Sequence, residues 1–352
     1  MRSCGKGIEE GKAIYIGVDL HRRAWHVTIM TREVELFSGS LPGNWDSLKR
    51  LLERYNGYRI EAVYEAGYFG FGLYDRLCAW GARCVVTPPS LIPREYGNRV
   101  KTDRKDSGKL AVLLSRGMLK EVWVPSPEQR CQRQVARTRR QLIGDRVRTQ
   151  LRIKAQLMSY GVEIPGPRGK WSQTYLENLR RLRFEDRWLE ESFRRLLDEY
   201  DFLSEQIKKQ TDLLKELSET DSYRESAGIL QSVFGIGLIS AMEILLEIGD
   251  FTRFRRSSQI AAYVGLTPSQ YSSGDKVRMG RITGIGKNSL RAILVEASWK
   301  LIRCDRRLRQ RYEGLKVRCG GKRAIVAIAR RLLIGIRAMI ITRQPYAQGL
   351  TA

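Results

Sequence analysis

The sequence is poor in histidine, has no closely spaced cysteines and contains no long uninterrupted apolar run, and each shortage excludes a class of protein. Its two histidines are His21 and His26. Tyrosine recombinases and rolling-circle nucleases need histidines further along the chain, so neither chemistry can be assembled here. The six cysteines form no CxxC pair, which argues against a zinc ribbon or a dense disulfide framework and is typical of a reducing cytoplasm.

The sequence also lacks the features of a secreted or membrane protein. Residues 1–12 have no apolar core of a signal peptide, and the most hydrophobic late stretch, residues 324–342, contains Arg330, Arg331 and Arg337. A bilayer-spanning helix would have to bury these three charges. We therefore expect a protein that is neither secreted nor embedded in a membrane.

Acidic residues are scarce relative to basic ones. The 352 residues include 63 Lys and Arg against 38 Asp and Glu, which gives a formal charge of +25. Residues 1–126 carry a net charge of +6, residues 127–226 of +4 and residues 227–352 of +15. Because 42% of the residues are hydrophobic, this charge belongs to a folded protein of two or three domains. The charge predicts a polyanionic partner, with nucleic acid as the first candidate.

Residues 12–126 predict an α/β domain. Apolar runs of strand length alternate with segments of helical spacing that stop at Gly57 and Gly81. The expected strands are 13–20, 24–31, 33–41, 58–67 and 82–89, and the expected helices are 44–57, 71–80 and 103–117. The order βββαβαβα is typical of the ribonuclease-H-like fold, although the pattern alone leaves other α/β folds open.

Residues 127–226 predict a helical region. An arginine-rich helix is expected over 127–160, followed by a turn at Pro165–Pro167. Apolar residues then recur from Tyr175 to Leu217 in a 4-3 spacing interrupted by Asp186 and Gln210, which predicts one coiled-coil helix. The simplest arrangement is an antiparallel hairpin of the two helices. A seam this regular would equally suit pairing between subunits.

Residues 227–345 predict a mostly helical C-terminal domain. Its first part resembles a helix-hairpin-helix, with a tight turn at Gly235-Ile236-Gly237 before a helix over 238–248. Such a turn offers backbone N–H groups to a DNA phosphate, whereas the alternative is an ordinary helical corner. A polar loop rich in glycine and serine is expected over 270–278, and an amphipathic helix over 289–301.

Four acidic residues stand where a metal site would need them. Asp19 and Glu65 end two strands, and Asp103 and Asp106 begin the third helix, one turn apart. Carboxylates at neighbouring strand ends and on one helix face can converge on divalent ions, and without such ions they would repel one another. The sequence therefore predicts that Mg²⁺ (or Mn²⁺) is held by these four residues, although each alone could be a cap.

The polar loop offers a candidate nucleophile. A serine beside glycine is flanked by Lys276, Arg278, Arg281 and Lys287, and such cations would stabilise an alkoxide and a pentacovalent phosphate. On these residues alone an ordinary turn is the simpler interpretation. The nearby GRITGIGKNS does not have P-loop spacing, which argues against an NTPase.

These motifs together resemble the DEDD transposases of the IS one-ten family of bacterial insertion sequences, which includes Piv-like DNA invertases and bridge-RNA-guided recombinases. The resemblance covers roughly 13–125 and 228–335, and Ser107 departs from the more usual alanine. It rests on GVDLH (17–21), YEA (64–66), KTDRKD (101–106), GIG (235–237), EIGD (247–250), GLTP (265–268), Ser273-Gly274 and Leu290-Arg291.

The resemblance implies specific roles. The N-terminal domain would be RuvC-like, with Asp19, Glu65, Asp103 and Asp106 binding metal, and Ser273 would be the nucleophile, with Ser272 as its neighbour. The coiled coil would form a homodimer, with a tetramer in the synaptic complex. A structured noncoding (bridge) RNA would pair with donor and target DNA, and the protein would act in the bacterial cytoplasm, associated with the nucleoid.

Three hypotheses follow. The first is a transposase and site-specific recombinase that acts through a serine–phosphate intermediate. The second is a RuvC-type nuclease or junction resolvase with water as the nucleophile, and the third is a non-enzymatic nucleic-acid-binding protein. The predicted nucleic-acid contacts are Arg137, Arg139, Arg140, Arg146, Arg148, Gly235, Gly237, Lys276, Arg278, Arg281 and Lys287, together with the basic stretch 303–323.

Overall fold

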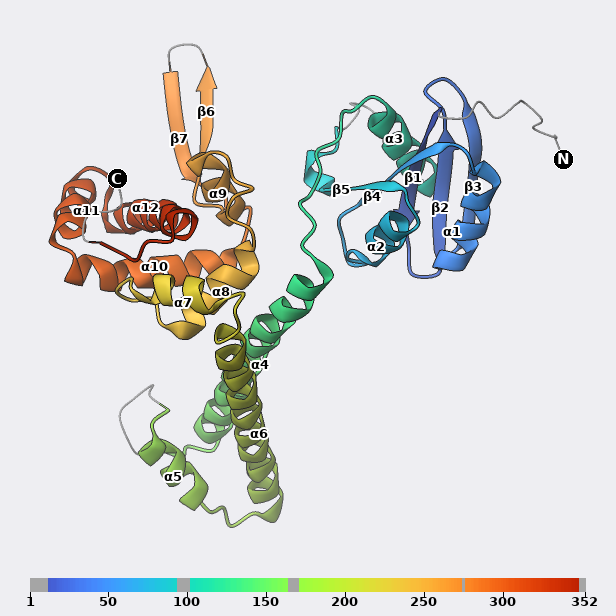
Figure 1. Cartoon of the computed structure of the whole chain (residues 1–352). Helices are drawn as coiled ribbons and strands as arrows, with labels where there is room; N and C mark the ends of the chain where they lie inside the picture. The colour runs from blue at the N-terminus through green and yellow to red at the C-terminus, as the bar shows by residue number, and fades with distance from the viewer. Residues whose placement is uncertain (1–11, 94–101, 164–170, 274–275, 348–352) are drawn as a thin grey trace. The chain divides into compact units, whose positions relative to one another are not determined.

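The computed structural model describes residues 12–93, 102–163, 171–273 and 276–347, and it divides the chain into two compact units (Figure 1). Unit 1 is Met1–Pro125 and unit 2 is Ser126–Ala352. The predicted turn at Pro165–Pro167 lies outside the described residues, and the further division of unit 2 at residue 226 stays a prediction. Within the described ranges, no helix is both long and apolar enough to cross a bilayer.

Unit 1 is a mixed five-stranded sheet with helices, in the strand order β3-β2-β1-β4-β5. β1 pairs antiparallel with β2 and parallel with β4, while β3 and β5 form the edges. This confirms the predicted order βββαβαβα and the RuvC-like, ribonuclease-H-like fold. The elements are β1 (Ala13–Leu20), β2 (Ala24–Met30), β3 (Glu35–Pro42), α1 (Trp45–Leu52), η1 (Glu53–Tyr55), β4 (Arg59–Glu65), α2 (Gly72–Ala79), β5 (Arg83–Thr87), η2 (Pro89–Leu91) and α3 (Asp103–Ser115).

The two faces of this sheet are covered by different helices. Ile14, Ile16 and Val18 of β1 pack in one apolar cluster with residues of α1 and α2. Tyr15, from the alternate positions of β1, packs in a second cluster with Leu110 of α3. Since side chains alternate along a strand, the odd-numbered positions of β1 face α3.

Unit 2 begins with a helical hairpin. α4 (Pro127–Ser159) and α6 (Arg187–Ser218) run antiparallel, because Arg139 of α4 bonds Thr211 while Arg152, further along α4, bonds Glu199. This confirms the predicted hairpin. Its apolar seam is buried within the chain: Ile153 and Leu157 of α4 lie in one cluster with Phe193, Leu197 and Tyr200 of α6.

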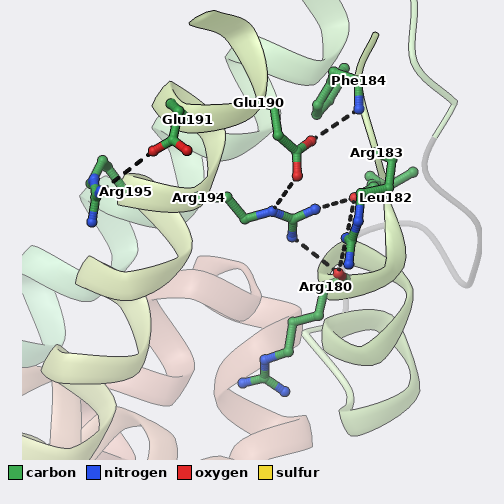
Figure 2. Close-up of polar contacts among 8 residues, drawn as sticks. All are labelled: Arg180, Leu182, Arg183, Phe184, Glu190, Glu191, Arg194 and Arg195. Atoms are coloured by element: carbon green, nitrogen blue, oxygen red, sulfur yellow. Dashed lines mark hydrogen bonds and ion pairs between the residues drawn. The ribbon is translucent and has the colours of Figure 1, made fainter. Parts of the chain in front are cut away.

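The prediction of one unbroken helix from Tyr175 to Leu217 is wrong. The structure has α5 (Gln173–Arg181) and α6, separated by residues 182–186. Figure 2 shows the side chains that hold this break: Glu190 accepts hydrogen bonds from the Phe184 amide and the Arg194 guanidinium, and Arg194 donates to the Arg180 and Leu182 carbonyls. Asp186 caps α6 by accepting from the Leu189 amide at 2.9 Å.

In its described residues, the rest of unit 2 has a helical core and one β-hairpin. The helices are α7 (Arg224–Gln231), α8 (Leu238–Ile248), α9 (Ser257–Val264), α10 (Asn288–Cys304), α11 (Arg306–Cys319) and α12 (Gly321–Thr342). The predicted pair of helices around the turn at Gly235 is present as α7 and α8, and the predicted helix at 289–301 as α10. Apolar residues of all six helices form one cluster.

The polar segment 270–278 is not the loop that the sequence suggested. β6 (Pro268–Ser273) and β7 (Lys276–Ile282) pair antiparallel, so that two residues, 274 and 275, connect them. Those two residues lie outside the described ranges. Glycine followed by aspartate is a typical sequence for a two-residue hairpin connection, and this signal could have predicted the strands.

Candidate active site

The four predicted metal ligands lie at one edge of unit 1. Val18 of β1 pairs with Tyr64 of β4 in parallel register, so the next residues along the two strands, Asp19 and Glu65, lie at the same end of the sheet. Asp19 is one residue before the end of β1, and Glu65 is the last residue of β4. Gly17 of β1 faces the backbone of α3, and Val63 of β4 packs with Leu110 of the same helix. Asp19 and Glu65 each lie two residues further along these strands. Both acids therefore stand at positions that face α3, whose first turn carries Asp103 and Asp106.

A glycine allows α3 to approach the sheet this closely. A Cβ atom at Gly17 would lie 2.0 Å from the Ser107 carbonyl oxygen and 2.7 Å from the Ala111 amide nitrogen. Both are backbone atoms of α3, so no side-chain rotation could make room. The absence of a side chain at position 17 thus sets the distance between β1 and α3, and with it the distance between Asp19 and the acids on α3.

Ser107 fixes the same helix laterally. Its side chain is buried, and its hydroxyl group lies 2.8 Å from both His26 Nδ1 and Thr28 Oγ1, two residues of β2. An alanine here would leave these polar groups without this partner. The Ser107 hydroxyl thus joins α3 to β2 through these two polar residues.

Asp19 and Asp103 converge on His21. His21 Nε2 lies 3.3 Å from Asp19 Oδ2 and 3.5 Å from Asp103 Oδ1, and one ligand atom from each residue lies within 4.8 Å of the others. Burial raises the pKa of Asp19, His21 opposes this rise, and the charges of Asp103 and Asp106 add to it. A cation between these groups would relieve the repulsion, so the residues fit a divalent metal, as the fold implies.

His21 is the member of this cluster that was not among the site residues predicted from the sequence. It directly follows β1, where its backbone amide donates to the Ala24 carbonyl at 3.1 Å. Residues two apart in extended backbone share a face, so the spacing between Asp19 and His21 was a usable signal. Within the described residues, the cluster with ligand atoms this close consists of Asp19, His21 and Asp103, while Glu65 is placed by strand register.

The predicted nucleophile, Ser273, is the last residue of β6 and is exposed. It pairs with Lys276 across the hairpin, and Tyr271 pairs with Arg278. Because Ser273 and Tyr271 are two residues apart, Ser273 and Arg278 stand on the same face. Arg281 is exposed near the end of β7, the strand that contains Arg278. Ser272 occupies the alternate position of β6.

The base of this hairpin is held by close backbone packing. A Cβ atom at Gly265, whose φ is +82°, would lie 2.1 Å from the Ile285 carbonyl oxygen. Arg291 donates to the Val264 carbonyl at 2.9 Å and to the Gly284 carbonyl at 3.2 Å. The Gly265–Pro268 and Leu290-Arg291 motifs therefore anchor the strand that ends at Ser273.

Several predicted nucleic-acid contacts on α4 form ion pairs within unit 2. The Arg137 guanidinium donates two hydrogen bonds to the Glu247 carboxylate, at 2.8 and 3.0 Å, and Lys287 lies 3.5 Å from the same carboxylate. Arg140 and Arg139 lie 2.8 and 3.8 Å from Glu243. Arg148 pairs with Asp145, and the Arg146 guanidinium lies 6.0 Å from the Tyr200 ring centre. The residues Arg137, Arg140, Arg148, Lys287 and Glu247 line a cavity of about 770 Å³.

Glu247 is only 2% exposed and is ionised at neutral pH. Burial would raise its pKa, but the hydrogen bonds from Arg137 and the charges of Lys287 and Arg133 hold the pKa at about 2. Part of the charge on α4 is thus used to balance the acids of α8.

The turn between α7 and α8 contains the other two predicted contacts. Gly235 has φ of +94°, and a Cβ atom there would lie 2.7 Å from Lys300 Cβ and 3.0 Å from the Ala297 carbonyl, both on α10. Gly237 is the N-cap of α8. Packing against α10 accounts for Gly235, and Gly237 precedes the first turn of α8, where amide groups have no hydrogen-bond acceptor within the helix.

Comparisons with known proteins give matches to two family models. A DEDD-type family model described as "Transposase" matches residues 16–162, and a model described as "Transposase IS116/IS110/IS902 family" matches residues 227–313. The putative transposase y4qE of Sinorhizobium fredii is 30% identical over 304 residues, which cover 84% of this chain and 73% of that protein.

Two further relatives extend over most of the chain. The transposase for insertion sequence element IS1533 of Leptospira borgpetersenii is 25% identical over 82% of this chain and 85% of its own length. The pilin gene-inverting protein of Moraxella lacunata is 25% identical over 94% of this chain and 97% of its own length. With an acid cluster in unit 1 and both family models matched, the chain belongs to the IS116/IS110/IS902 family of transposases, enzymes of DNA recombination.

Proposed function

We propose that the chain moves an insertion element as a site-specific recombinase, through a serine–phosphate intermediate on Ser273. The observation that carries this proposal is the convergence of Asp19 and Asp103 near the end of β1, with Asp106 one turn further along α3 and Glu65 at the end of β4, in a chain that also exposes Ser273 at a strand end. The similarity to a gene-inverting protein supports strand exchange over simple hydrolysis.

The reaction needs no external energy source, because each P–O bond that breaks is replaced by another P–O bond. The Ser273 hydroxyl oxygen forms a bond to phosphorus, the bond from phosphorus to one DNA oxygen breaks, and that oxygen receives the proton. Mg²⁺ (or Mn²⁺) held by Asp19, Glu65, Asp103 and Asp106 would polarise a phosphodiester. Arg278, on the face of Ser273, stabilises the negative charge of the phosphate. The reverse reaction, with a hydroxyl end of another strand, rejoins the DNA.

Trapping the intermediate tests this proposal. The full-length protein is incubated with labelled element-end DNA and divalent metal, then denatured and resolved for covalent adducts. Ser273→Ala should abolish the adduct, while the matched variant Ser272→Ala should retain it. A covalent adduct that persists in Ser273→Ala contradicts the serine assignment. Protein-free hydrolysed ends from the unmodified protein would favour the nuclease alternative, with water as the nucleophile.

Donor DNA, target DNA and a structured noncoding RNA are the proposed nucleic-acid partners. α11 is the strongest candidate surface: Arg306, Arg307, Arg311 and Arg318 are exposed, and among the described residues the ion pair on this helix joins Lys316 to Glu313. Burial lowers the pKa of Arg331, and the charge of Arg311 lowers it further, so like charges gather here. Exposed, unneutralised cations are the ones that release counterions from a phosphate backbone.

The salt dependence of binding tests this surface. Each phosphate contact on duplex DNA contributes about 0.9 to the slope of log affinity against log salt, so replacing Arg307 and Arg311 by Gln should lower the slope by roughly 2. Arg152→Gln is the matched control, because both Glu199 oxygens already accept from Arg152. Equal affinity for the element's own RNA and an unrelated hairpin would contradict a dedicated RNA partner.

A homodimer that assembles into a tetramer at synapsis is proposed on the exposed faces of the helical hairpin. Val147, Leu151 and Met158 recur on one side of α4, and Trp188, Phe202 and Leu213 on one side of α6, all at least 45% exposed. Leu151→Glu should shift the sedimentation of the full chain toward a monomer. Unchanged sedimentation would contradict this surface. Such an assembly would act in the bacterial cytoplasm at the nucleoid.

A further inference from the structure

His21 stands between two of the proposed metal ligands. Its Nε2 atom is 3.3 Å from Asp19 Oδ2 and 3.5 Å from Asp103 Oδ1, and its side chain is 55% exposed. Neighbouring ligands of an octahedral ion bound at 2.0–2.2 Å are about 3 Å apart. The nitrogen thus already lies near the place of a third ligand, before any metal draws the groups together.

We propose that His21 binds the metal through Nε2, together with Asp19 and Asp103, and that the site consequently prefers Mn²⁺ to Mg²⁺. This inference rests on the proposed metal site and adds a ligand that the four-acid set does not contain. Mg²⁺ takes oxygen ligands and keeps its water shell, whereas first-row transition metals accept imidazole nitrogen alongside carboxylates. One nitrogen among carboxylate oxygens therefore shifts the preference toward Mn²⁺.

The backbone around His21 supports a fixed ligand position. The His21 amide donates to the Ala24 carbonyl, which closes the turn between β1 and β2. Asp19 pairs with His26 across the same two strands, so the turn cannot change its register without moving Asp19. The imidazole is thus attached to the rigid end of the sheet and needs only side-chain rotation to meet an ion.

A competing explanation is that a protonated His21 only balances the charge of the two carboxylates. Such a charge contact would also account for the distances from His21 Nε2 to Asp19 and to Asp103. The two explanations differ in one observable: a metal-bound imidazole places its nitrogen directly on the ion, while a protonated imidazole is repelled by the ion and stays outside its coordination sphere.

Pulsed electron paramagnetic resonance of bound Mn²⁺ separates them. Electron spin-echo modulation reports ¹⁴N nuclei bonded directly to Mn²⁺, and the chain has only two histidines that could supply an imidazole nitrogen. The full-length protein is loaded with one equivalent of Mn²⁺. We expect ¹⁴N modulation in the unmodified protein, its replacement by the ¹⁵N pattern after ¹⁵N-histidine labelling, and its loss in His21→Gln.

His26→Gln is the matched control. His26 Nδ1 contacts the Ser107 hydroxyl, so this variant removes the other imidazole and should keep the nitrogen modulation. Titration calorimetry provides a second readout: His21→Gln should weaken Mn²⁺ binding by about tenfold and Mg²⁺ binding by much less, which removes the preference.

Three outcomes overturn the inference. Mn²⁺ that binds without nitrogen modulation shows that His21 is not a ligand, while the proposed metal site stands. Modulation that persists in His21→Gln assigns the nitrogen elsewhere. If Mn²⁺ binds equally well to the unmodified protein and to Asp19→Asn, or to neither, the proposed metal site itself fails together with the inference.

Discussion

A methyl group at position 17 has no space in unit 1, and this gives a sharp test of how the acid cluster is positioned. In Gly17→Ala the new carbon would lie 2.0 Å from the Ser107 carbonyl oxygen and 2.7 Å from the Ala111 amide nitrogen. Favourable carbon contacts lie near 3.5 Å, so α3 must move away from β1 by about 1 Å or more. Overpacking of this kind costs roughly 1–3 kcal/mol.

This movement separates the ligands. Asp103 belongs to α3 and moves with it, while Asp19 stays with β1. A displacement of about 1 Å in a catalytic group lowers rates by roughly 100-fold. We therefore expect Gly17→Ala to weaken Mn²⁺ binding and to lower strand cleavage by about two orders of magnitude, with faster hydrogen exchange in the peptides that cover β1 and α3.

Gly108→Ala is the matched control on the same helix. Its added carbon would lie 3.9 Å from Thr28 Oγ1, an ordinary contact, and replacing a helical glycine by alanine stabilises by about 0.5–1 kcal/mol. This variant should bind metal and cleave as the unmodified protein does. If Gly17→Ala retained full metal affinity and cleavage, the close packing of α3 on β1 would not position the acids.

Three further substitutions test other parts of the molecule. The pKa of Glu247 is about 2 in the fold against 4.5 normally, so above pH 4.5 its ionised form adds roughly 3 kcal/mol to the free energy of unfolding, and this contribution is lost as the pH falls toward 2. In urea unfolding, Glu247→Gln should therefore be less stable than the unmodified protein at pH 7, and its stability should change less as the pH is lowered. The raised pKa of Asp19 means that its charge opposes folding without metal at neutral pH. Asp19→Asn should therefore keep or raise metal-free stability and lose stabilisation by Mn²⁺, as measured by thermal unfolding. Tyr68 is 99% exposed and lies three residues after Glu65, so its ring is free to stack on a DNA base near the acid cluster. Tyr68→Ala should therefore weaken single-stranded DNA binding by about 1–3 kcal/mol in fluorescence anisotropy, whereas Tyr68→Phe, which keeps the ring, should not.

Unit 1 could be predicted from local sequence patterns because its strands are buried and its helices end at clear stops. Gly57 and Gly81 have φ of +94° and +96°, a conformation that glycine adopts without strain, and both follow predicted helices. The acids Asp19 and Glu65 were found for the same reason, since each ends a recognisable strand. What the pattern did not contain is the contact of Gly17 with α3.

The break between α5 and α6 shows why the heptad pattern misled. Apolar residues on both sides of the break are buried in the same cluster, so the spacing continues although the helix does not. The turn is held by Arg194, which bonds carbonyl groups twelve and fourteen residues earlier in the chain. A spacing rule reports which residues are buried, and it does not report whether the backbone between them stays helical.

The net charge also leaves out the contacts that each residue makes in the fold, because a count of basic residues does not distinguish a binding surface from an internal ion pair. Arg137 and Arg307 contribute equally to the net charge, yet Arg137 is bonded to Glu247, 110 residues later, and Arg307 is exposed on α11. A cation that already neutralises a buried carboxylate has little charge left for a phosphate, and removing Arg137 takes two hydrogen bonds from the Glu247 carboxylate, which keeps Lys287 at 3.5 Å. Substitution at Arg137 would therefore lower nucleic-acid binding through the fold of unit 2, while substitution at Arg307 would lower it through the contact itself. Only the second effect should change the salt dependence without changing stability.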